Sequence, residues 1–395
     1  MPRSDRSIAL LLALAAIVLY VVSGLGHSTV WDYYAQLAEA LLRGRWWLED
    51  APAYLNELLP CGDGRYCVAY VPLPALAVLP FLVAFRDGTA QTIASAVAGG
   101  LAAAPAFLAL RRLAVPRNLA VATTVFATCG TTLWFTASDG RAWYIAHSVA
   151  VLLASLALLA ALDGRPAWVV GALIGAAALA RLPVGLAAPG LALLVSRRRE
   201  EPLARVVVLG ALGMAPLIAL ELTYDLLRWG VPFEVGYARL VRDDPFFRDG
   251  LLSLSYLPRH LYAIFMQAPD LVDGSPLFLR PSWIGVSLVL TSPAFGYAIA
   301  ALVRLRASAD WSALALAAAL PLVPDVLHGT VGFAQFGYRF SLDAQPFLLP
   351  LVAIGAGWTT SGWRGLGWPF IAVIAYGVLA NLYGVVAITW LGYVR

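Results

Sequence analysis

The sequence contains no lysine, so all 27 of its Lys+Arg residues are arginines. Charge is scarce in general, because charged residues make up 13% of the 395 residues, against about 25% in soluble domains. This scarcity excludes an ordinary soluble enzyme. Nucleic-acid binding is excluded too, because it needs a basic stripe on one face, whereas the dense run Arg197 to Arg199 lies between two apolar stretches.

Cysteine is also scarce, with three residues and no Cys-x-x-Cys motif. This pattern points to neither a metal-binding nor a thiol-catalytic site, and Cys129 lies inside an apolar stretch. Cys61 and Cys67 flank two glycines and close a small loop if they are oxidised, which an exported loop permits. Two free thiols are the alternative.

Apolar residues, by contrast, account for 61% of the chain, which predicts an all-α polytopic membrane protein. Residues 8 to 25 form a helix of about 27 Å, just enough for a hydrocarbon core of roughly 30 Å. They resemble a signal peptide as well. We favour a retained first span, because no small-x-small cleavage site precedes a soluble domain and the chain returns repeatedly to the membrane.

Further apolar stretches alternate with short arginine-bearing connections, which the positive-inside rule assigns to the cytoplasm together with the N-terminus. Both ends of residues 167 to 196 then lie inside, so we expect two short helices that meet near Arg181-Leu182-Pro183. The total is about eleven spans. Those after the first are 89 to 110, 118 to 136, 143 to 162, the two halves of 167 to 196, 205 to 227, 284 to 304, 309 to 328, 343 to 357 and 367 to 391.

One domain covers residues 1 to 395, with long outer loops at 26 to 88 and 228 to 283. The spans fall at 1 to 25, at 89 to 227 (two to seven) and at 284 to 395 (eight to eleven). Residues 71 to 85 are apolar but short and hold three prolines, so we expect an interfacial or re-entrant segment, with a true span as the alternative.

The first outer loop places Asp32 where a helix leaves the bilayer. Residues 35 to 43 predict a short amphipathic helix at the membrane surface, with Leu37, Leu41 and Leu42 on its apolar face and Trp46 and Trp47 as headgroup anchors. A carboxylate held there can act as general base on a substrate hydroxyl. A solvated cap for the helix that begins at Tyr33 is the alternative.

Ionisable residues gather at the predicted outer ends of the other spans, which favours a shared outer cleft over scattered ion pairs. They are Asp139, Arg141, His147, Glu221, Asp225, Asp325, His328 and Asp343. Arg181 has no acid within seventeen residues on either side, so we expect it to bind an anion such as a lipid phosphate. Snorkelling to headgroups is the alternative. Arg339 is a second candidate.

Six separated motifs cover most of the chain. They are Trp31-Asp32-Tyr33-Tyr34 after the first helix, the Tyr70-Val-Pro-Leu-Pro stretch, Trp143-Tyr-Ile-Ala-His147, the Arg181-Leu-Pro hairpin, Tyr224 to Tyr237, and Gln335-Phe-Gly-Tyr338-Arg339-Phe. Together these motifs resemble the GT-C superfamily of integral-membrane glycosyltransferases. The resemblance implies transfer of a sugar from a polyprenyl-phosphate donor to a lipid, glycan or protein hydroxyl, with inversion, at the extracytoplasmic face of a bacterial inner membrane.

The resemblance also implies roles for individual residues. Asp32 becomes the catalytic base and Asp139 the second acid. Arg181, Arg339 and Arg141 are the expected donor-phosphate ligands. The expected substrate cleft is lined by Trp31, Tyr33, Tyr34, Tyr70, His147, Glu234 and Tyr338. Asp32 is followed by Tyr33 rather than by a second acid, so no cofactor is assigned and a divalent cation is left open.

There are two rival interpretations: a lipid flippase or small-molecule transporter, and a non-catalytic membrane scaffold. A scaffold would not need Arg181 or the acids. A transporter predicts repeat symmetry and broken helices near the bilayer midplane, with charges towards both faces. The sequence shows no repeat, and its charges cluster at one face, which favours the transferase.

Overall fold

The computed structural model describes residues 2–24, 28–85, 87–233, 236–272, 278–303, 309–360 and 366–393. Glu234, one of the expected cleft residues, lies outside the described residues. The described chain is predominantly helical, as the composition predicts, with two short antiparallel hairpins.

Helices lie within every apolar stretch that the sequence predicts to span the membrane, although residues 284–287 of one stretch precede its first helix. In chain order they are α1 (Arg3–Ser23), α4 (Asp87–Leu101), α5 (Ala103–Arg112), α6 (Arg117–Cys129), α7 (Leu133–Asp139), α8 (Ala142–Leu162), α9 (Ala167–Ala178), α10 (Ala188–Arg199), α11 (Leu203–Trp229), α14 (Leu288–Thr291), α15 (Gly296–Val303), α16 (Ala309–Val326), α17 (Gln345–Thr360) and α18 (Trp368–Val385), which continues as a π-helical turn (Val386–Trp390).

Five helical segments of the described chain are long and apolar enough to cross a membrane: Arg3–Ser23, Gly88–Arg112, Ala142–Leu162, Leu203–Trp229 and Trp368–Trp390. A sixth is the pair α6 and α7, which is bent by 49°. The predicted break in residues 167 to 196 is confirmed, because a 3-10 helix (η2, Leu182–Ala187) separates α9 from α10. The full count of eleven spans stays a prediction.

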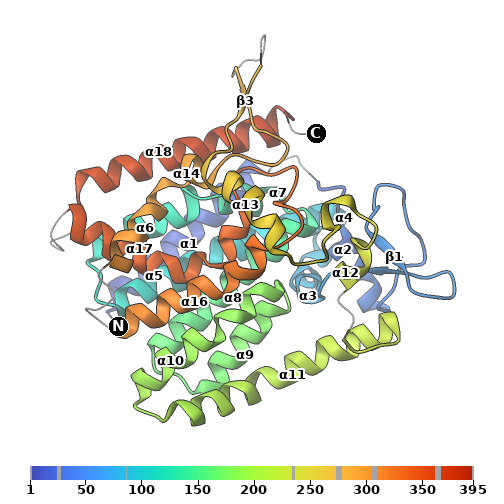
Figure 1. The fold of residues 1–395 in the computed structure, drawn as a ribbon, viewed down its shortest axis with the longest axis horizontal. Helices are drawn as coiled ribbons and strands as arrows, with labels where there is room; N and C mark the ends of the chain where they lie inside the picture. The colour runs from blue at the N-terminus through green and yellow to red at the C-terminus, as the bar shows by residue number, and fades with distance from the viewer. Residues whose placement is uncertain are drawn as a thin grey trace.

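The bundle has a buried centre and an exposed flank. Within its most apolar window, 78% of α8 is buried inside the protein, whereas only 6% of α11 is. α8 packs against α4, α5 and α9, and α11 lies along the outside of α9 (Figure 1). Glycines make that last contact close, because a Cβ on Gly171 would collide with the backbone of Gly210. The exposed flank of α11 is leucine-rich, as expected of a helix surface that contacts lipid.

The first loop folds against one end of the bundle, here called the loop end, at the right of Figure 1. It contains α2 (Tyr33–Leu42), the strands β1 (Leu58–Pro60) and β2 (Tyr66–Val68), α3 (Leu73–Val78) and a 3-10 turn (Leu79–Val83). Strands β1 and β2 pair antiparallel with Leu59 opposite Cys67. The segment 73–83 is a short apolar helix, shorter than a span.

Helix α2 differs from the sequence prediction in its surroundings. Leu37 is completely buried against neighbouring elements, whereas Leu42, expected on the same apolar face, is 67% exposed. The helix packs against α3 and α4 and starts at Tyr33 rather than at residue 35. Packing by protein decides the orientation of α2, and its contact with a membrane surface stays a prediction.

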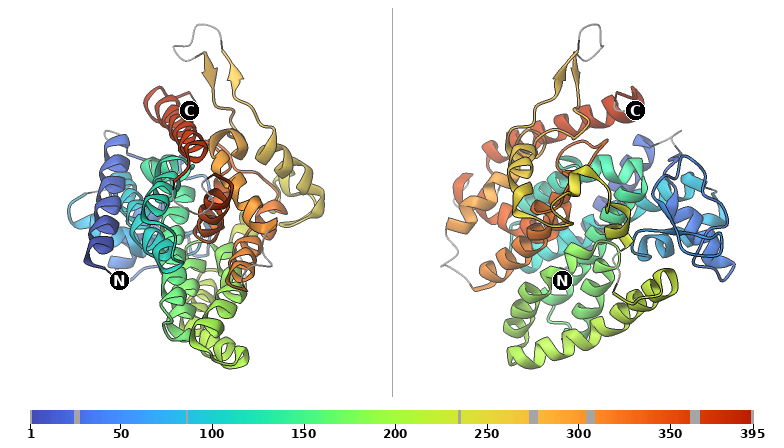
Figure 2. Two further views of the ribbon diagram at one scale, coloured as in Figure 1. Left: turned by 90° about the vertical axis from the view of Figure 1, so that its left-hand side faces the viewer. Right: turned by 45° about the vertical axis from the view of Figure 1, so that its right-hand side comes forward.

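The second long loop carries α12 (Gly236–Leu240), α13 (Leu257–Phe265) and the hairpin of β3 (Asp270–Leu271) and β4 (Leu279–Arg280). The hairpin projects away from the bundle in every view (Figures 1 and 2). Helix α12 lies at the loop end, beside the first loop. The 3-10 helix η7 (Arg339–Asp343) leads into α17 at the same end.

Candidate active site at the loop end

Asp32 occupies the N-cap position of α2, but its side chain does not cap the helix. The backbone N–H groups of Tyr34 and Ala35 instead donate to the side-chain oxygen of Gln91 in α4, at 3.0 and 3.1 Å. The Asp32 carboxylate is 4% exposed and accepts from Gln36 at 3.2 Å. Because Gln91 satisfies the helix terminus, the structure argues against the cap interpretation of Asp32.

Gln91 also joins the two segments that carry the predicted catalytic acids. Its amide nitrogen donates to the carbonyl oxygens of Trp31 and Gly140, at 3.0 and 2.8 Å. These residues adjoin Asp32 and Asp139 in the sequence, so one side chain links the two loops. Gly140 is required there, because it has a φ of +69° and a Cβ would lie 2.5 Å from the Cα of Thr92. Sequence reasoning missed Gln91, whose role depends on a contact between distant segments.

Arg141 is held by Asp139 and by aromatic rings. Its Nε lies 2.9 Å from the Asp139 carboxylate, and its guanidinium lies 4.6 Å from the centre of the Trp31 ring. The rings of Trp31 and Trp143 are 5.9 Å apart. Asp139 therefore compensates the charge of Arg141 within the protein.

Arg339 has different surroundings. Its residue is 8% exposed, and its Nη1 donates to the backbone oxygen of Phe333 and the side-chain oxygen of Gln335, at 3.3 and 3.0 Å. Within the described ranges no carboxylate lies within 4 Å of this guanidinium, and its Nε has no hydrogen-bond partner. A buried cation without a counter-ion is costly, so the geometry suits an incoming anion.

Tyr144 connects the two arginines. The guanidinium groups of Arg141 and Arg339 lie 5.7 and 5.6 Å from the centre of its ring, and its hydroxyl donates to the carbonyl oxygen of Ala334. Asp139 is therefore linked to Arg339 through the side chains of Arg141 and Tyr144.

Glu57 is a site residue that sequence reasoning missed. Its Oε2 accepts hydrogen bonds from the Tyr70 hydroxyl and, at 2.9 Å, from the Trp143 indole nitrogen. Burial raises the pKa of Glu57 above its ordinary value, although these hydrogen bonds and the charge of Arg339 act in the opposite direction. The cysteine pair in the sequence could have pointed to Glu57, because the hairpin closed by Cys61–Cys67 brings residue 57 next to residues 69 and 70.

The expected cleft aromatics lie at different depths. Tyr33, Tyr34 and Tyr338 are at most 2% exposed. The Tyr33 hydroxyl donates to Asn56 at 3.3 Å and accepts from the Glu57 N–H at 3.1 Å, and the Tyr338 hydroxyl lies 2.8 Å from His260 Nδ1. These three side chains are packed inside the protein, whereas Trp31 and Tyr70 are half-buried.

Arg181 belongs to a buried group that we call the Arg181 cluster: His147, Arg181, Asp325 and Asp343. Its Nη2 lies 2.7 Å from Asp343 and 3.2 Å from Asp325, and His147 Nδ1 lies 2.9 Å from Asp343. The anions that pair with Arg181 are therefore carboxylates from segments distant in the sequence. The structure brings these four side chains together. A shared outer cleft and a phosphate-binding role for Arg181 stay predictions.

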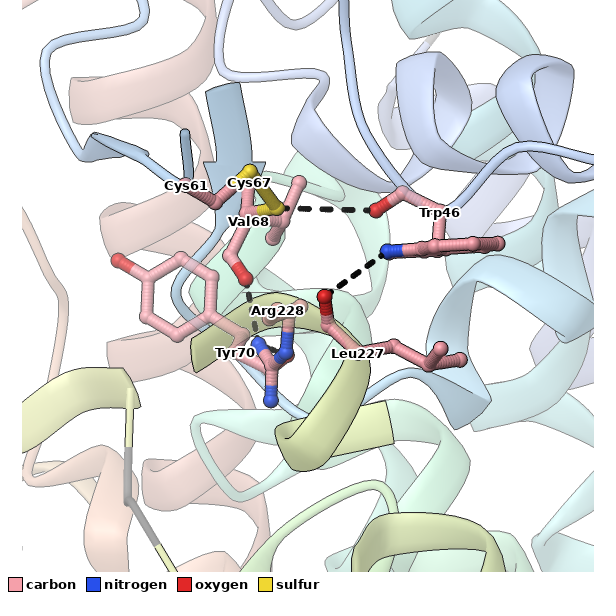
Figure 3. Close-up of a disulfide and its surroundings, with 7 residues drawn as sticks. All are labelled: Trp46, Cys61, Cys67, Val68, Tyr70, Leu227 and Arg228. Atoms are coloured by element: carbon pink, nitrogen blue, oxygen red, sulfur yellow. Dashed lines mark hydrogen bonds between the residues drawn. A yellow bond between two sulfur atoms is a disulfide. The ribbon is translucent and has the colours of Figure 1, made fainter. Parts of the chain in front are cut away.

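Glu221 and Asp225 form a second group, with Arg228 near the end of α11. Arg228 lies 2.6 Å from Asp225 and donates to the carbonyl oxygens of Val68 and Tyr70, at 2.6 and 3.1 Å. Figure 3 shows this contact beside the Cys61–Cys67 disulfide. In the same figure Trp46, expected to anchor at headgroups, donates to the carbonyl oxygen of Leu227 at 3.2 Å. These bonds fix the first loop to α11.

The residues that the structure describes contain no group of three or more His, Cys, Asp or Glu side chains arranged to hold a metal ion. The question of a divalent cation, which the sequence leaves open, stays open.

No protein-family model and no curated protein matches the sequence. The fold is similar to the crystal structure of ArnT from Cupriavidus metallidurans in the apo state, with a TM-score of 0.54 and 14% sequence identity. The similarity covers 98% of this chain and 77% of ArnT. The GT-C fold implied by the sequence motifs is therefore confirmed at the level of architecture.

Proposed function

We propose that this protein is a membrane glycosyltransferase that moves a sugar from a polyprenyl-phosphate donor to a hydroxyl of a lipid, glycan or protein acceptor, with inversion at the sugar carbon. Its fold is similar to that of ArnT, and its sequence motifs resemble the GT-C superfamily of glycosyltransferases. The observation that carries the proposal is Arg339, a buried guanidinium with no carboxylate within 4 Å in the described part of the chain.

Arg339 would bind the donor phosphate. Polyprenyl phosphate is already a good leaving group, so the reaction needs a fixed positive charge where negative charge develops. Arg141 and Arg181 are the further predicted phosphate ligands, and both already contact carboxylates. We therefore give Arg339 the main role and the other two a supporting one.

Asp32 would be the base that removes the proton of the acceptor hydroxyl, with Asp139 as the second acid. Support comes from Gln91, which caps α2 in place of Asp32 and joins the loops of both acids. Glu57 is a further candidate base, because its raised pKa and its hydrogen bonds to Tyr70 and Trp143 suit proton transfer. Trp31 and Tyr70 would contact the sugar.

The proposed setting is a bacterial inner membrane crossed by about eleven spans. The N-terminus would lie in the cytoplasm and the loop end outside it, where the donor headgroup arrives. The Cys61–Cys67 disulfide supports this orientation, since disulfides persist in oxidising compartments.

The test is transfer by purified protein in liposomes with a panel of radiolabelled polyprenyl-phosphate sugars and a membrane lipid extract. Wild-type protein should yield labelled product, and Asp32→Asn should lower the rate by about 10²–10⁴-fold, the typical contribution of a general base. Asp63→Asn, an exposed acid of the same loop, is the matched control and should retain the rate. Equal rates for wild type and Asp32→Asn would reject the assignment of Asp32.

A further inference from the structure

The Arg181 cluster has an uneven charge balance. It combines two carboxyl groups with one guanidinium and one imidazole, contributed by α8, the turn before η2, α16 and η7. His147, Asp325 and Asp343 are at most 3% exposed. With both carboxyls ionised and the imidazole neutral, the cluster would carry a buried net negative charge, which is costly inside a helical bundle.

The two carboxyl groups also lie against each other. Both bind the same Arg181 Nη2, at 3.2 and 2.7 Å. Two ionised carboxylates held this close repel each other, and one proton on the pair removes that repulsion.

The partners of the two carboxyls differ. Asp343 accepts from Arg181 Nε and Nη2 and from His147 Nδ1, and three such donors stabilise an ionised group. Asp325 accepts from Arg181 Nη2 at 3.2 Å, and its Oδ2 is buried with no hydrogen-bond donor facing it among the described residues. The proton therefore belongs on Asp325.

We propose that Asp325 and Asp343 form a proton-binding site that holds one proton on Asp325 at neutral pH, so that the Arg181 cluster is electrically neutral. Protons reach it past Arg181, whose side chain is 22% exposed whereas those of the two acids are nearly inaccessible. The charged and titratable groups facing the two acids are Arg181, His147, Arg339 and Tyr338.

The proton on Asp325 affects binding of the donor phosphate at Arg339. This consequence rests on the proposed function. Asp325 and Arg339 interact electrostatically, so an ionised Asp325 would offset part of the positive charge offered to the donor phosphate. The KM for donor should therefore rise as alkaline pH removes the proton, while kcat changes little.

Infrared spectroscopy of the purified protein tests the proton site without any substrate. Aspartate labelled with carbon-13 at the side-chain carboxyl marks aspartate bands and leaves glutamate bands, including those of Glu57 and Glu221, unshifted. We expect a label-sensitive carbonyl band of a neutral carboxyl at neutral pH in wild type. It should disappear in Asp325→Asn and persist in Asp249→Asn, an exposed control.

Two results would overturn the proposal: no label-sensitive neutral-carboxyl band in wild type, or the same band in Asp325→Asn. If Asp325→Asn does not fold, Asp325→Glu replaces it. In aspartate-labelled protein the neutral band should then lose its label sensitivity, and a label-sensitive band that persists would count against Asp325.

A kinetic measurement adds the link to donor binding. In wild type the donor KM should rise roughly tenfold at alkaline pH, the effect of one unit charge at moderate separation within a protein. In Asp325→Asn the KM should not change with pH. Because the infrared test needs no catalysis, an inactive protein with the neutral band would refute the glycosyltransferase function and leave the proton site standing.

Discussion

Arg181 and Arg339 lie on the same aromatic ring in opposite electrostatic surroundings. Their guanidinium groups are 5.2 and 5.3 Å from the centre of the Phe340 ring. Arg181 faces two carboxyl groups, whereas the described partners of Arg339 are uncharged oxygens of Phe333 and Gln335. Two arginines of one polar region can therefore serve different purposes, one holding helices together and the other offering net positive charge.

The comparison predicts that loss of Arg181 mainly affects stability. Arg181→Ala leaves Asp343 buried without its main counter-charge, and breaking a buried ion pair in this way costs about 3–5 kcal/mol. Thermal unfolding in detergent should show a large drop in the midpoint for Arg181→Ala. Arg242→Ala, an exposed arginine, is the control and should match wild type.

An equal drop in the unfolding midpoint for Arg339→Ala and Arg181→Ala would contradict this difference between the two arginines. Removal of a buried charge that lacks a carboxylate partner should instead leave the midpoint close to that of wild type.

Loss of Arg339 should mainly affect transfer. Arg339→Gln keeps a polar side chain but removes the fixed charge, and loss of one stabilising group for developing negative charge typically lowers kcat by about 10²–10³-fold. The measurement is the transfer rate in liposomes at saturating donor, with the unfolding midpoint recorded for the same preparation. A transfer rate within threefold of wild type would remove Arg339 from the proposed phosphate site.

The sequence predicts the architecture better than the pairing of charges. Helices lie where apolar runs and flanking arginines predict them, and the break before Pro183 follows from the requirement that both ends of one stretch share a side. These features depend on residues close together in the chain. The membrane imposes them locally, because every backbone polar group in lipid must be satisfied within its own helix.

The partners of Arg181 are 144 and 162 residues away in the sequence. The residues that neighbour Arg181 in the sequence therefore do not reveal its partners. The sequence identifies both arginines, Arg181 and Arg339, and the acids Asp325 and Asp343 as candidate site residues. Only the packing of the helices shows which of them form ion pairs. Gln91 and Glu57 are missed for the same reason, since their significance comes from contacts with distant loops.

A glycine pair offers a subtler test of Arg339. Gly332 has a φ of +92°, and a Cβ there would lie 2.5 Å from Arg339 Nη1. Gly250 has a φ of +94°, and a Cβ there would have no other atom within 4 Å, so alanine meets the same backbone strain without touching the site. A displacement of about 1 Å in a binding group can cost up to 10²-fold, so Gly332→Ala should slow transfer by about 10- to 100-fold.

Gly250→Ala should leave transfer near the wild-type rate, although it meets similar backbone strain. Equal transfer rates for the two variants would mean that the position of the Arg339 guanidinium is not critical.

The smallest expected effect concerns His328, which both arginines influence. Burial lowers the pKa of His328 to about 4 from 6.5, and the charges of Arg181 and Arg339 act in the same direction. The native imidazole is neutral while the unfolded one gains a proton below pH 6.5. The stability that this group contributes is therefore complete above pH 6.5 and is lost as the pH falls towards 4.

An anion on Arg339 would cancel part of the charge that disfavours protonated His328, so donor binding should raise the pKa of His328 by a fraction of a unit. Nitrogen-15 NMR of histidine-labelled protein can follow this titration, because the chain has only four histidines and His328→Gln assigns the signal. In Arg339→Gln the donor should no longer shift the titration. If the anion were instead bound by Arg181, the donor would still raise the pKa of His328 in Arg339→Gln, and the distinction between the two arginines would be reversed.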